Sequence, residues 1–206
     1  MTSREQHWQH VYETKTPNAV SWYQVDPALS LGLIDGLHLP EDAAIVDVGA
    51  GASVLVDRLL DCGFKNLTLV DLAASALAHT RDRLGARAAA VKFIPGDVTR
   101  LSLGHKVDLW HDRAVLHFLT SADDRARYRG ALDAHLKPGG HAIIATFAVG
   151  GPEKCSGLPV RQYDAARLMD LLGDGYELVN ECFEEHTTPW GSTQAFACFL
   201  VRKKAD

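Results

Sequence analysis

A short apolar run that ends in two closely spaced glycines constrains the fold of this chain more than any other feature. The run spans residues 45–48, and Gly49 and Gly51 follow it at once. Its β-branched side chains predict a buried strand, and glycine lets the chain turn tightly and approach a ligand with no Cβ atom in the way. We therefore expect a strand over residues 44–48, a ligand-facing turn, and a helix whose start is capped by Ser53.

Two carboxylates flank this turn and narrow the choice of ligand. Asp71 follows the next apolar run, where an acidic side chain accepts hydrogen bonds from a ribose diol. Asp47 precedes the turn, where a carboxylate repels a diphosphate and attracts an ammonium group. Val54 stands where the dinucleotide fingerprint carries its third glycine. The pattern favours S-adenosylmethionine over a nicotinamide dinucleotide as the cofactor.

Apolar runs alternate with amphipathic segments along the rest of the chain. Further strands are expected over residues 67–71, 91–94, 107–110, 141–147, 176–184 and 193–201, and further helices over 73–84, 122–136 and 164–172. This alternation is typical of an α/β, doubly wound, seven-stranded, mostly parallel Rossmann-like sheet. The link between the last two strands is too short for a parallel crossover, so we expect an antiparallel terminal strand. The residues from Leu136 to Gly140 predict a stop and a turn.

The first forty residues differ in pattern from those that follow. Apolar residues at helical spacing are interrupted by a proline-containing break, so we expect a helical lid over residues 1–40 and a core domain over residues 41–206. Trp22 and Tyr23 are adjacent in the irregular stretch and would close over a cationic sulfonium. Trp8 is expected to cover the edge of the core.

Composition excludes several classes of partner. The chain has 206 residues, a hydrophobic content of 47% and a formal net charge of −5. These values fit one substantial core and argue against binding to nucleic acid, because nucleic-acid-binding proteins usually carry a concentrated basic surface. The four cysteines lack metal-ligand spacing, and no apolar run is long enough to span a membrane. We expect no metal, no membrane partner and a reducing, cytoplasmic setting.

Five motifs together resemble those of a known family. They are Asp47-Val48-Gly49-Ala50-Gly51, the strand-end Asp71, Gly96-Asp97, Asp108-Leu109-Trp110-His111-Asp112 and Leu136-Lys137-Pro138-Gly139-Gly140. The combination resembles the class I S-adenosylmethionine-dependent methyltransferases over roughly residues 41–201. Within that family, Trp22-Tyr23 and residues 112–116 are similar to bacterial relatives of the branch that methylates lysine in elongation factor and citrate synthase.

The resemblance implies a role for each residue around the turn. Gly49 and Gly51 would pass under the methionine portion of the cofactor, and Asp47 would lie near its ammonium group. Asp71 would accept hydrogen bonds from both ribose hydroxyls. Leu72 would pack on the adenine face.

The resemblance also assigns residues after the third and fourth strands. Asp97 would accept a hydrogen bond from the adenine amino group, while the Val98 amide would donate to a ring nitrogen. His111 would border the sulfonium. If the acceptor arrives protonated, Asp112, His111 or Tyr23 would take its proton as general base.

The reaction implied is direct in-line displacement of the methyl group onto a small-molecule or protein side-chain acceptor. Lysine-modifying relatives carry an Asp-Lys pair after the fourth strand, where this chain has Asp112 and Arg113, so both acceptor classes stay open. Two alternatives also remain. One is a nicotinamide-dependent oxidoreductase on a similar sheet, and the other is a non-catalytic module that binds adenosylmethionine.

Overall fold

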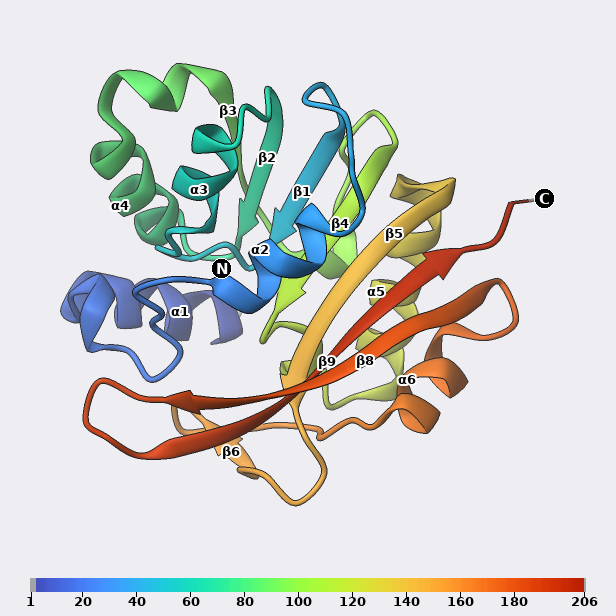
Figure 1. Ribbon diagram of the computed structural model, residues 1–206. Coiled ribbons are helices and arrows are strands. Elements are labelled where there is room, and N and C mark those ends of the chain that lie inside the picture. Colours follow the sequence, from blue (N-terminus) through green and yellow to red (C-terminus); the bar gives the residue numbers. More distant parts are fainter. Residues whose placement is uncertain (1–2, 206) are drawn as a thin grey trace.

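One seven-stranded sheet forms the centre of the computed structural model, which describes residues 3–205 (Figure 1). The strands are β1 (Ala44–Val48), β2 (Asn66–Asp71), β3 (Val91–Pro95), β4 (Val107–Arg113), β5 (Leu136–Phe147), β8 (Tyr176–Thr187) and β9 (Thr193–Lys203). Their order across the sheet is β3-β2-β1-β4-β5-β9-β8. Strands β1 to β5 pair in parallel, whereas β9 runs antiparallel to both of its neighbours. The predicted fold class is confirmed.

Helices cover both faces of this sheet. One face carries α2 (Ala28–Asp35), α3 (Leu55–Asp61) and α4 (Ala74–Leu84), and the other carries α5 (Ala122–His135) and α6 (Ala165–Leu172). Short 3₁₀ turns lie at η1 (Pro17–Ala19), η2 (Gly85–Ala90), η3 (Val98–Arg100) and η4 (Leu116–Phe118). Every residue of β1 is buried, because a central parallel strand is covered on both faces.

The bounds of two central strands differ from expectation. Strand β4 runs on to Arg113 instead of ending at residue 110. Strand β5 already begins at Leu136, so the predicted turn lies within it as an irregularity, with Gly139 at a φ of 77°. The last strand of the chain, β9, inserts between β5 and β8, which leaves β8 as the edge strand. A small hairpin of β6 (Lys154–Cys155) and β7 (Leu158–Pro159) was not expected.

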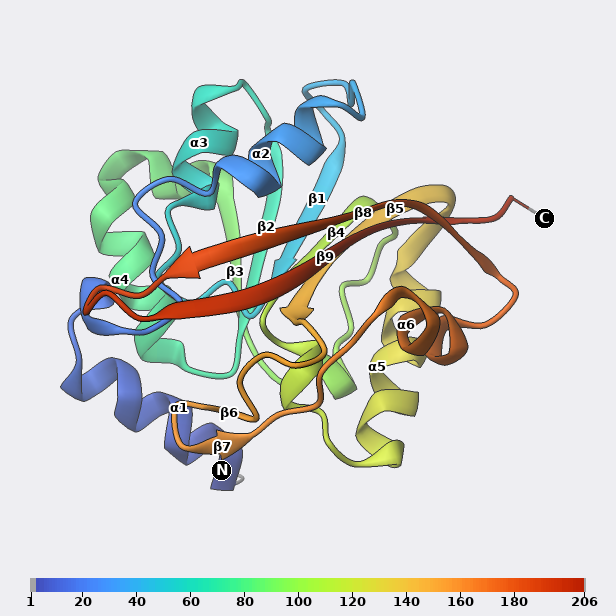
Figure 2. The ribbon, with the colours of Figure 1, turned by 60° about the horizontal axis from the view of Figure 1, so that its bottom comes forward.

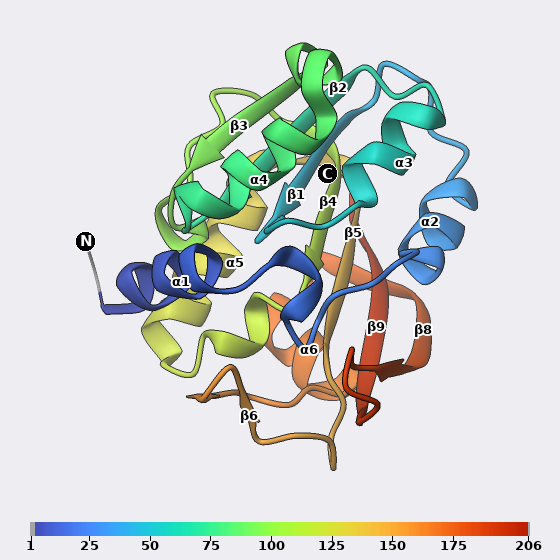
Figure 3. The same ribbon diagram turned by 90° about the vertical axis from the view of Figure 1, so that its left-hand side faces the viewer.

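The N-terminal segment lies across the ends of the strands. Helix α1 (Ser3–Thr14) packs against α4, near the tip of β1 (Figure 3). The tip of the β8–β9 hairpin reaches across to the same segment (Figure 2), where the imidazole Nε2 of His186 donates to the carbonyl of Ser21 at 2.6 Å. Residues 3–40 therefore cover the end of the sheet that carries the expected site.

The structure gives no membrane-spanning helix among residues 3–205, since none of the helices there is both long and apolar enough. Within the same range, no group of three or more histidine, cysteine or acidic side chains is arranged to hold a metal ion.

Candidate functional site

A cavity of about 710 Å³, its opening to solvent included, lies at the carboxyl ends of β1 to β4. We call it the first cavity. It is lined from the sheet by Gly49, Val70, Asp71, Leu72, Gly96, Asp97, Val98, Arg113, Ala114, Val115, Phe118 and Leu119, and from other segments by Arg4, Trp8, Tyr12, Trp22 and Cys155. Ligands of open α/β sheets bind at this end of the strands. The position therefore fits a cofactor site.

Asp71 stands at the end of β2 with its carboxylate fixed by the backbone. One oxygen accepts from the amide of Gly51 and the other from the amide of Ala73, both at 2.8 Å. Burial raises the pKa of Asp71 to about 6, and the two backbone donors oppose that rise. Each oxygen keeps a lone pair beyond these bonds, so the side chain can accept from a diol in the first cavity.

Asp97 and its neighbours form another stretch of the wall. A single oxygen of Asp97, Oδ1, accepts from both the amide and the hydroxyl of Thr99, at 2.9 and 2.8 Å. This cap orders η3 and leaves Oδ2 outside these contacts. Leu72 and Val98 place apolar surface in the same cavity. The structure thus brings together Asp71, Leu72, Asp97 and Val98, the four residues predicted to surround the adenosine.

The two glycines of the turn are required by backbone conformation and by close neighbours. Gly49 has a φ of 65° and Gly51 a φ of 55°, a region that favours glycine. A Cβ atom on Gly49 would lie 1.9 Å from Val115 Cγ2, and one on Gly51 would lie 2.4 Å from the hydroxyl of Tyr12. Gly49 lines the first cavity, whereas Gly51 lies beside it and shapes it through its amide bond to Asp71.

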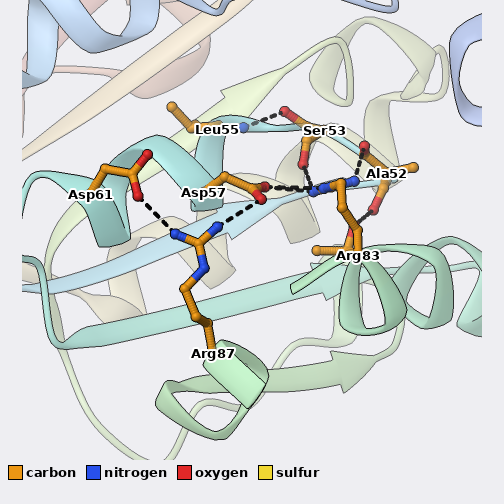
Figure 4. A network of polar contacts seen from close by, with 9 residues as sticks. Ala52, Ser53, Leu55, Asp57, Asp61, Arg83 and Arg87 are labelled. Atoms are coloured by element: carbon orange, nitrogen blue, oxygen red, sulfur yellow. Dashed lines mark hydrogen bonds and ion pairs between the residues drawn. The ribbon is translucent and has the colours of Figure 1, made fainter. Parts of the chain in front are cut away.

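A guanidinium holds the far end of the turn in place (Figure 4). Arg83 of α4 donates to the carbonyls of Ala52 at 2.9 Å and Ser53 at 2.6 Å, and it also pairs with Asp57. Arg87 pairs with Asp57 and with Asp61 but contacts no carbonyl of the turn. The turn is therefore fastened to α4 as well as to β2. Arg83 was not predicted from the sequence, because no sequence pattern indicates which backbone carbonyls a side chain will bind.

Four aromatic side chains, those of Trp8, Tyr12, Trp22 and Phe118, line the first cavity. Trp8 meets Trp22 at a centroid distance of 5.4 Å and Phe118 at 4.9 Å, both edge to face. The indole of Trp22 donates to the hydroxyl of Tyr12 at 3.2 Å. Trp8 was expected only to cover the core edge, yet it lines this cavity together with Trp22. An aromatic wall of this kind attracts a cation such as a sulfonium.

A second cavity, of about 550 Å³ with its opening, adjoins the first. We call it the second cavity. Tyr12, Trp22, Gly49 and Arg113 line both cavities, so these four residues form the boundary between them. The second cavity is also lined by Tyr23, Gln24, Ser30, Asp47, Ser53 and His111, among others. The side chains that line the second cavity are more polar than those that line the first.

Asp47 and His111 face the second cavity and are bonded to each other. His111 Nδ1 lies 2.6 Å from an oxygen of Asp47, and His111 Nε2 lies 2.9 Å from the hydroxyl of Ser30. The exposed fraction of each of these three residues is 5% or less. Asp47, His111 and Tyr23 line the second cavity and Asp71 lines the first, and the two cavities meet at Gly49. The predicted contact of Asp47 and His111 with the cofactor stays a prediction.

Asp112 lines neither cavity. It is fully buried, and its carboxylate accepts from the hydroxyl of Tyr128 at 2.6 Å and from the amides of Val115 and Leu116 at 2.8 and 3.2 Å. Burial raises its pKa to about 6. Since strand residues alternate between faces, His111 points toward α2 while Asp112 points toward α5. These contacts support a structural role for Asp112 in shaping the turn after β4. Its predicted role as a base stays untested.

Arg113 was not predicted as a site residue, although its place after β4 had been noted. Its guanidinium donates to the carbonyl of Trp22 at 3.0 Å, lies 3.5 Å from a carboxylate oxygen of Glu184, and stacks 4.6 Å above the ring of Phe196. It thereby joins β4, β8 and the N-terminal segment at the boundary of the two cavities.

Comparison with known proteins agrees with this geometry. Residues 45–140 match the family described as a methyltransferase domain. A zebrafish (Danio rerio) protein named eEF1A lysine and N-terminal methyltransferase is 25% identical over 150 residues, which is 71% of this chain and 21% of that protein. The chain thus spans about a fifth of the length of this curated relative.

Solved structures share the fold over most of the chain. One, described as converting a disulfide bond into a thioacetal group during echinomycin biosynthesis, has a TM-score of 0.77 at 20% identity and covers 98% of this chain and 93% of its own. Another is the Burkholderia thailandensis 1,6-didemethyltoxoflavin-N1-methyltransferase with its substrate and S-adenosylhomocysteine. It has a TM-score of 0.67 at 24% identity, and the match covers 86% of this chain and 77% of that one.

Proposed function

We propose that this chain, whose residues 45–140 match a methyltransferase domain, uses S-adenosylmethionine to transfer a methyl group to a small molecule held between its two cavities. One observation carries the proposal. The first cavity joins a backbone-fixed carboxylate, apolar surface and an aromatic wall, and the second cavity opens beside it.

The residues of the first cavity fit the cofactor chemically. We propose that Asp71 holds the ribose hydroxyls, that Asp97 and Val98 recognise the adenine edge, and that Leu72 packs on its face. Asp71 keeps free lone pairs, and Oδ2 of Asp97 lies outside the cap. The cofactor supplies the electrophilic methyl group. The protein aligns the two reactants and keeps water out, and such positioning accounts for up to about 7–11 kcal/mol of a barrier.

The covering segment favours a small acceptor over a large one. Trp8, Tyr12 and Trp22 close the cavities from the N-terminal side, and the β8–β9 hairpin is bonded to the same segment. A pocket covered in this way encloses a small molecule, whereas a protein side chain needs an open groove.

A protein lysine is the second candidate, and two observations favour it. The curated relative that matches 71% of this chain is named for eEF1A lysine and N-terminal methylation. A surface groove, shared at Tyr23 and Gln24 with the second cavity, is lined by the carboxylates of Asp26, Glu184 and Glu185. Acidic side chains attract a cationic acceptor.

Incubation with radiolabelled S-adenosylmethionine and a cell extract tests both candidates. After the reaction, the extract is separated into small-molecule and protein fractions. Label in the small-molecule fraction alone is the expected result, and label in protein alone would move the acceptor to the second candidate. Calorimetry with the unlabelled cofactor accompanies the assay. Tight binding without transfer to either fraction would instead indicate a non-catalytic binding module.

A further inference from the structure

Ser30, His111 and Asp47 form a connected line of polar side chains that ends in the second cavity. We propose that this line is a proton relay, which takes the proton of a hydroxyl or ammonium acceptor as the methyl group is transferred. The inference rests on the proposed function. It names the chemical class of the acceptor and adds Ser30 as the relay residue that contacts it.

The geometry defines the direction of the relay. The 2.6 Å contact makes His111 Nδ1 the donor to the carboxylate of Asp47. With the proton of a neutral ring on Nδ1, the Nε2 atom is an acceptor, so the Ser30 hydroxyl donates to it across 2.9 Å. The hydroxyl oxygen of Ser30 then retains lone pairs for a further donor.

Ser30 is the contact point because both ring nitrogens of His111 are already engaged. All three side chains line the second cavity, and each comes from a different element, namely α2, β4 and β1. An acceptor in this cavity therefore reaches the imidazole through the hydroxyl. The same cavity is bounded by Gly49 and Trp22, which also line the first cavity.

The acceptor atom forms a bond to the methyl carbon, and the sulfur–carbon bond breaks with its electron pair staying on sulfur. The acceptor's proton passes to the oxygen of Ser30, whose own proton passes to Nε2 of His111. Asp47 stabilises the resulting imidazolium, which later returns its proton to solvent. A thiolate acceptor carries no such proton and would not need the relay.

Charged and polar groups surround His111. Asp47 faces it from β1 and Ser30 approaches it from α2, whereas its strand neighbours Asp112 and Arg113 point to other partners. The carboxylate of Asp47 directly balances an imidazolium. A ring placed between a carboxylate and a hydroxyl is thus suited to hold a proton for the time of one turnover.

The first test uses the free protein. A proton NMR spectrum should show a strongly downfield Nδ1 proton for His111, and the signal should persist in Ser30→Ala and vanish in Asp47→Asn. Absence of this signal from the wild-type protein would overturn the assigned direction of the relay.

The second test compares two serines that line the same cavity. Ser53 bonds the amide of Leu55 and does not contact His111, so Ser53→Ala is the matched control. Transfer from radiolabelled cofactor to the labelled extract fraction should fall about 10²-fold in Ser30→Ala, since general-base catalysis contributes 10²–10⁴-fold. Cofactor affinity by calorimetry should stay within twofold.

The pH profile separates a relay from a purely structural role. The wild-type rate should level off at high pH because the relay takes the proton of the acceptor, while the Ser30→Ala rate should keep rising with pH as the acceptor ionises by itself. Equal rates for Ser30→Ala and Ser53→Ala would overturn the relay but leave the methyl transfer standing. A wild-type protein that neither binds the cofactor nor transfers label would instead contradict the proposed function.

Discussion

The sheet and the N-terminal segment are held in different ways. Strands β1, β4 and β5 carry a closed layer of apolar side chains, with Val46, Leu109 and Ile144 all at 0% exposure. Residues 3–24 contribute aromatic rings to the cavities. A small buried cluster joins Tyr12 to Ala52, Ala73 and Ala76, with Trp8 and Trp22 packed against it, and single hydrogen bonds add to this packing. His186 donates to the carbonyl of Ser21 and Arg113 to that of Trp22, at 2.6 and 3.0 Å.

This difference gives the site two unlike walls. The fixed wall is formed by the carboxyl ends of β1 to β4 and the turn from Gly49 to Ser53. The other wall is formed by the N-terminal segment and opens more easily. Single hydrogen bonds contribute about 0.5–1.5 kcal/mol each, whereas opening the sheet requires the exposure of a whole apolar layer. Regions with few buried apolar contacts open at free energies below that of global unfolding. Helix α2 packs into the apolar layer on one face of the sheet, so we propose that residues 3–24 are the part of the predicted lid that opens for ligands, while α2 and the strand ends stay in place.

Removal of one charge from the fixed wall should have the largest effect on cofactor affinity. Asp71→Asn removes the charge that receives the ribose hydroxyls, and hydrogen bonds to charged groups are worth about 1.5–3 kcal/mol each. Cofactor affinity measured by calorimetry should fall about 10²-fold or more. Asp61→Asn, at an exposed ion pair with Arg87, is the control and should leave affinity unchanged. A change of less than threefold in Asp71→Asn would remove Asp71 from the site.

The fixed wall should also respond to acid through a buried histidine. The His117 ring is fully buried and its Nδ1 accepts from the amide of Phe147, and burial lowers its pKa from 6.5 to about 3. Between these values the unfolded chain holds a proton that the folded chain lacks, so stability is lost as pH falls below 6.5. His117→Gln removes this loss.

Urea unfolding at two pH values measures the effect. The stability of His117→Gln relative to wild type should improve by about 2 kcal/mol between pH 7 and pH 5, from 1.36 kcal/mol for each pH unit below 6.5. Asp71 and Asp112 have raised pKa values of about 6 and act with the opposite sign, but they are present in both proteins and cancel in the comparison. An unchanged difference would show that His117 is protonated in the folded state.

The fixed wall is also the part that sequence reasoning predicted best. The strand over 44–48, the turn at Gly49 and the carboxylate Asp71 are local features, and the parallel order of β1 and β2 follows from their connection. Asp97 was predicted to accept a hydrogen bond from the adenine amino group. In the structure it both caps η3 and lines the cavity, because one oxygen serves the cap.

The surroundings that the sequence did not indicate depend on long-range packing. Ser30 contacts His111 across 81 positions of the chain, and nothing near either residue in the sequence indicates that α2 docks there. Asp112 was placed beyond the end of a strand, but β4 continues to Arg113 and its pleat turns Asp112 onto Tyr128. Trp8 and Tyr12 lie within a helix of ordinary amphipathic pattern, and only the position of α1 makes them cavity residues.

A weakened lid should open more often without unfolding the sheet. His186→Leu removes the donor to the carbonyl of Ser21 and leaves the hairpin pairing intact. Amide hydrogen exchange over residues 20–24 should quicken about fivefold, as expected for about 1 kcal/mol, while exchange in β1 and β4 stays the same. His10→Leu, on the exposed face of α1, is the control. Faster exchange across the whole sheet would mean that the segment and the sheet open as one unit.

The smallest effect on cofactor affinity is expected for Arg83, which holds the turn of the fixed wall from α4. Arg83→Met removes the donors to the carbonyls of Ala52 and Ser53 but touches no ligand-facing atom, so cofactor affinity should fall only about three- to fivefold, through a looser turn. Arg87→Met breaks ion pairs with Asp57 and Asp61 on the same surface without reaching the turn, and should leave affinity unchanged. Equal affinities in the two variants would mean that the glycines and the Asp71 bond to Gly51 hold the turn by themselves, in which case the fixed wall ends at β2 and does not extend to α4.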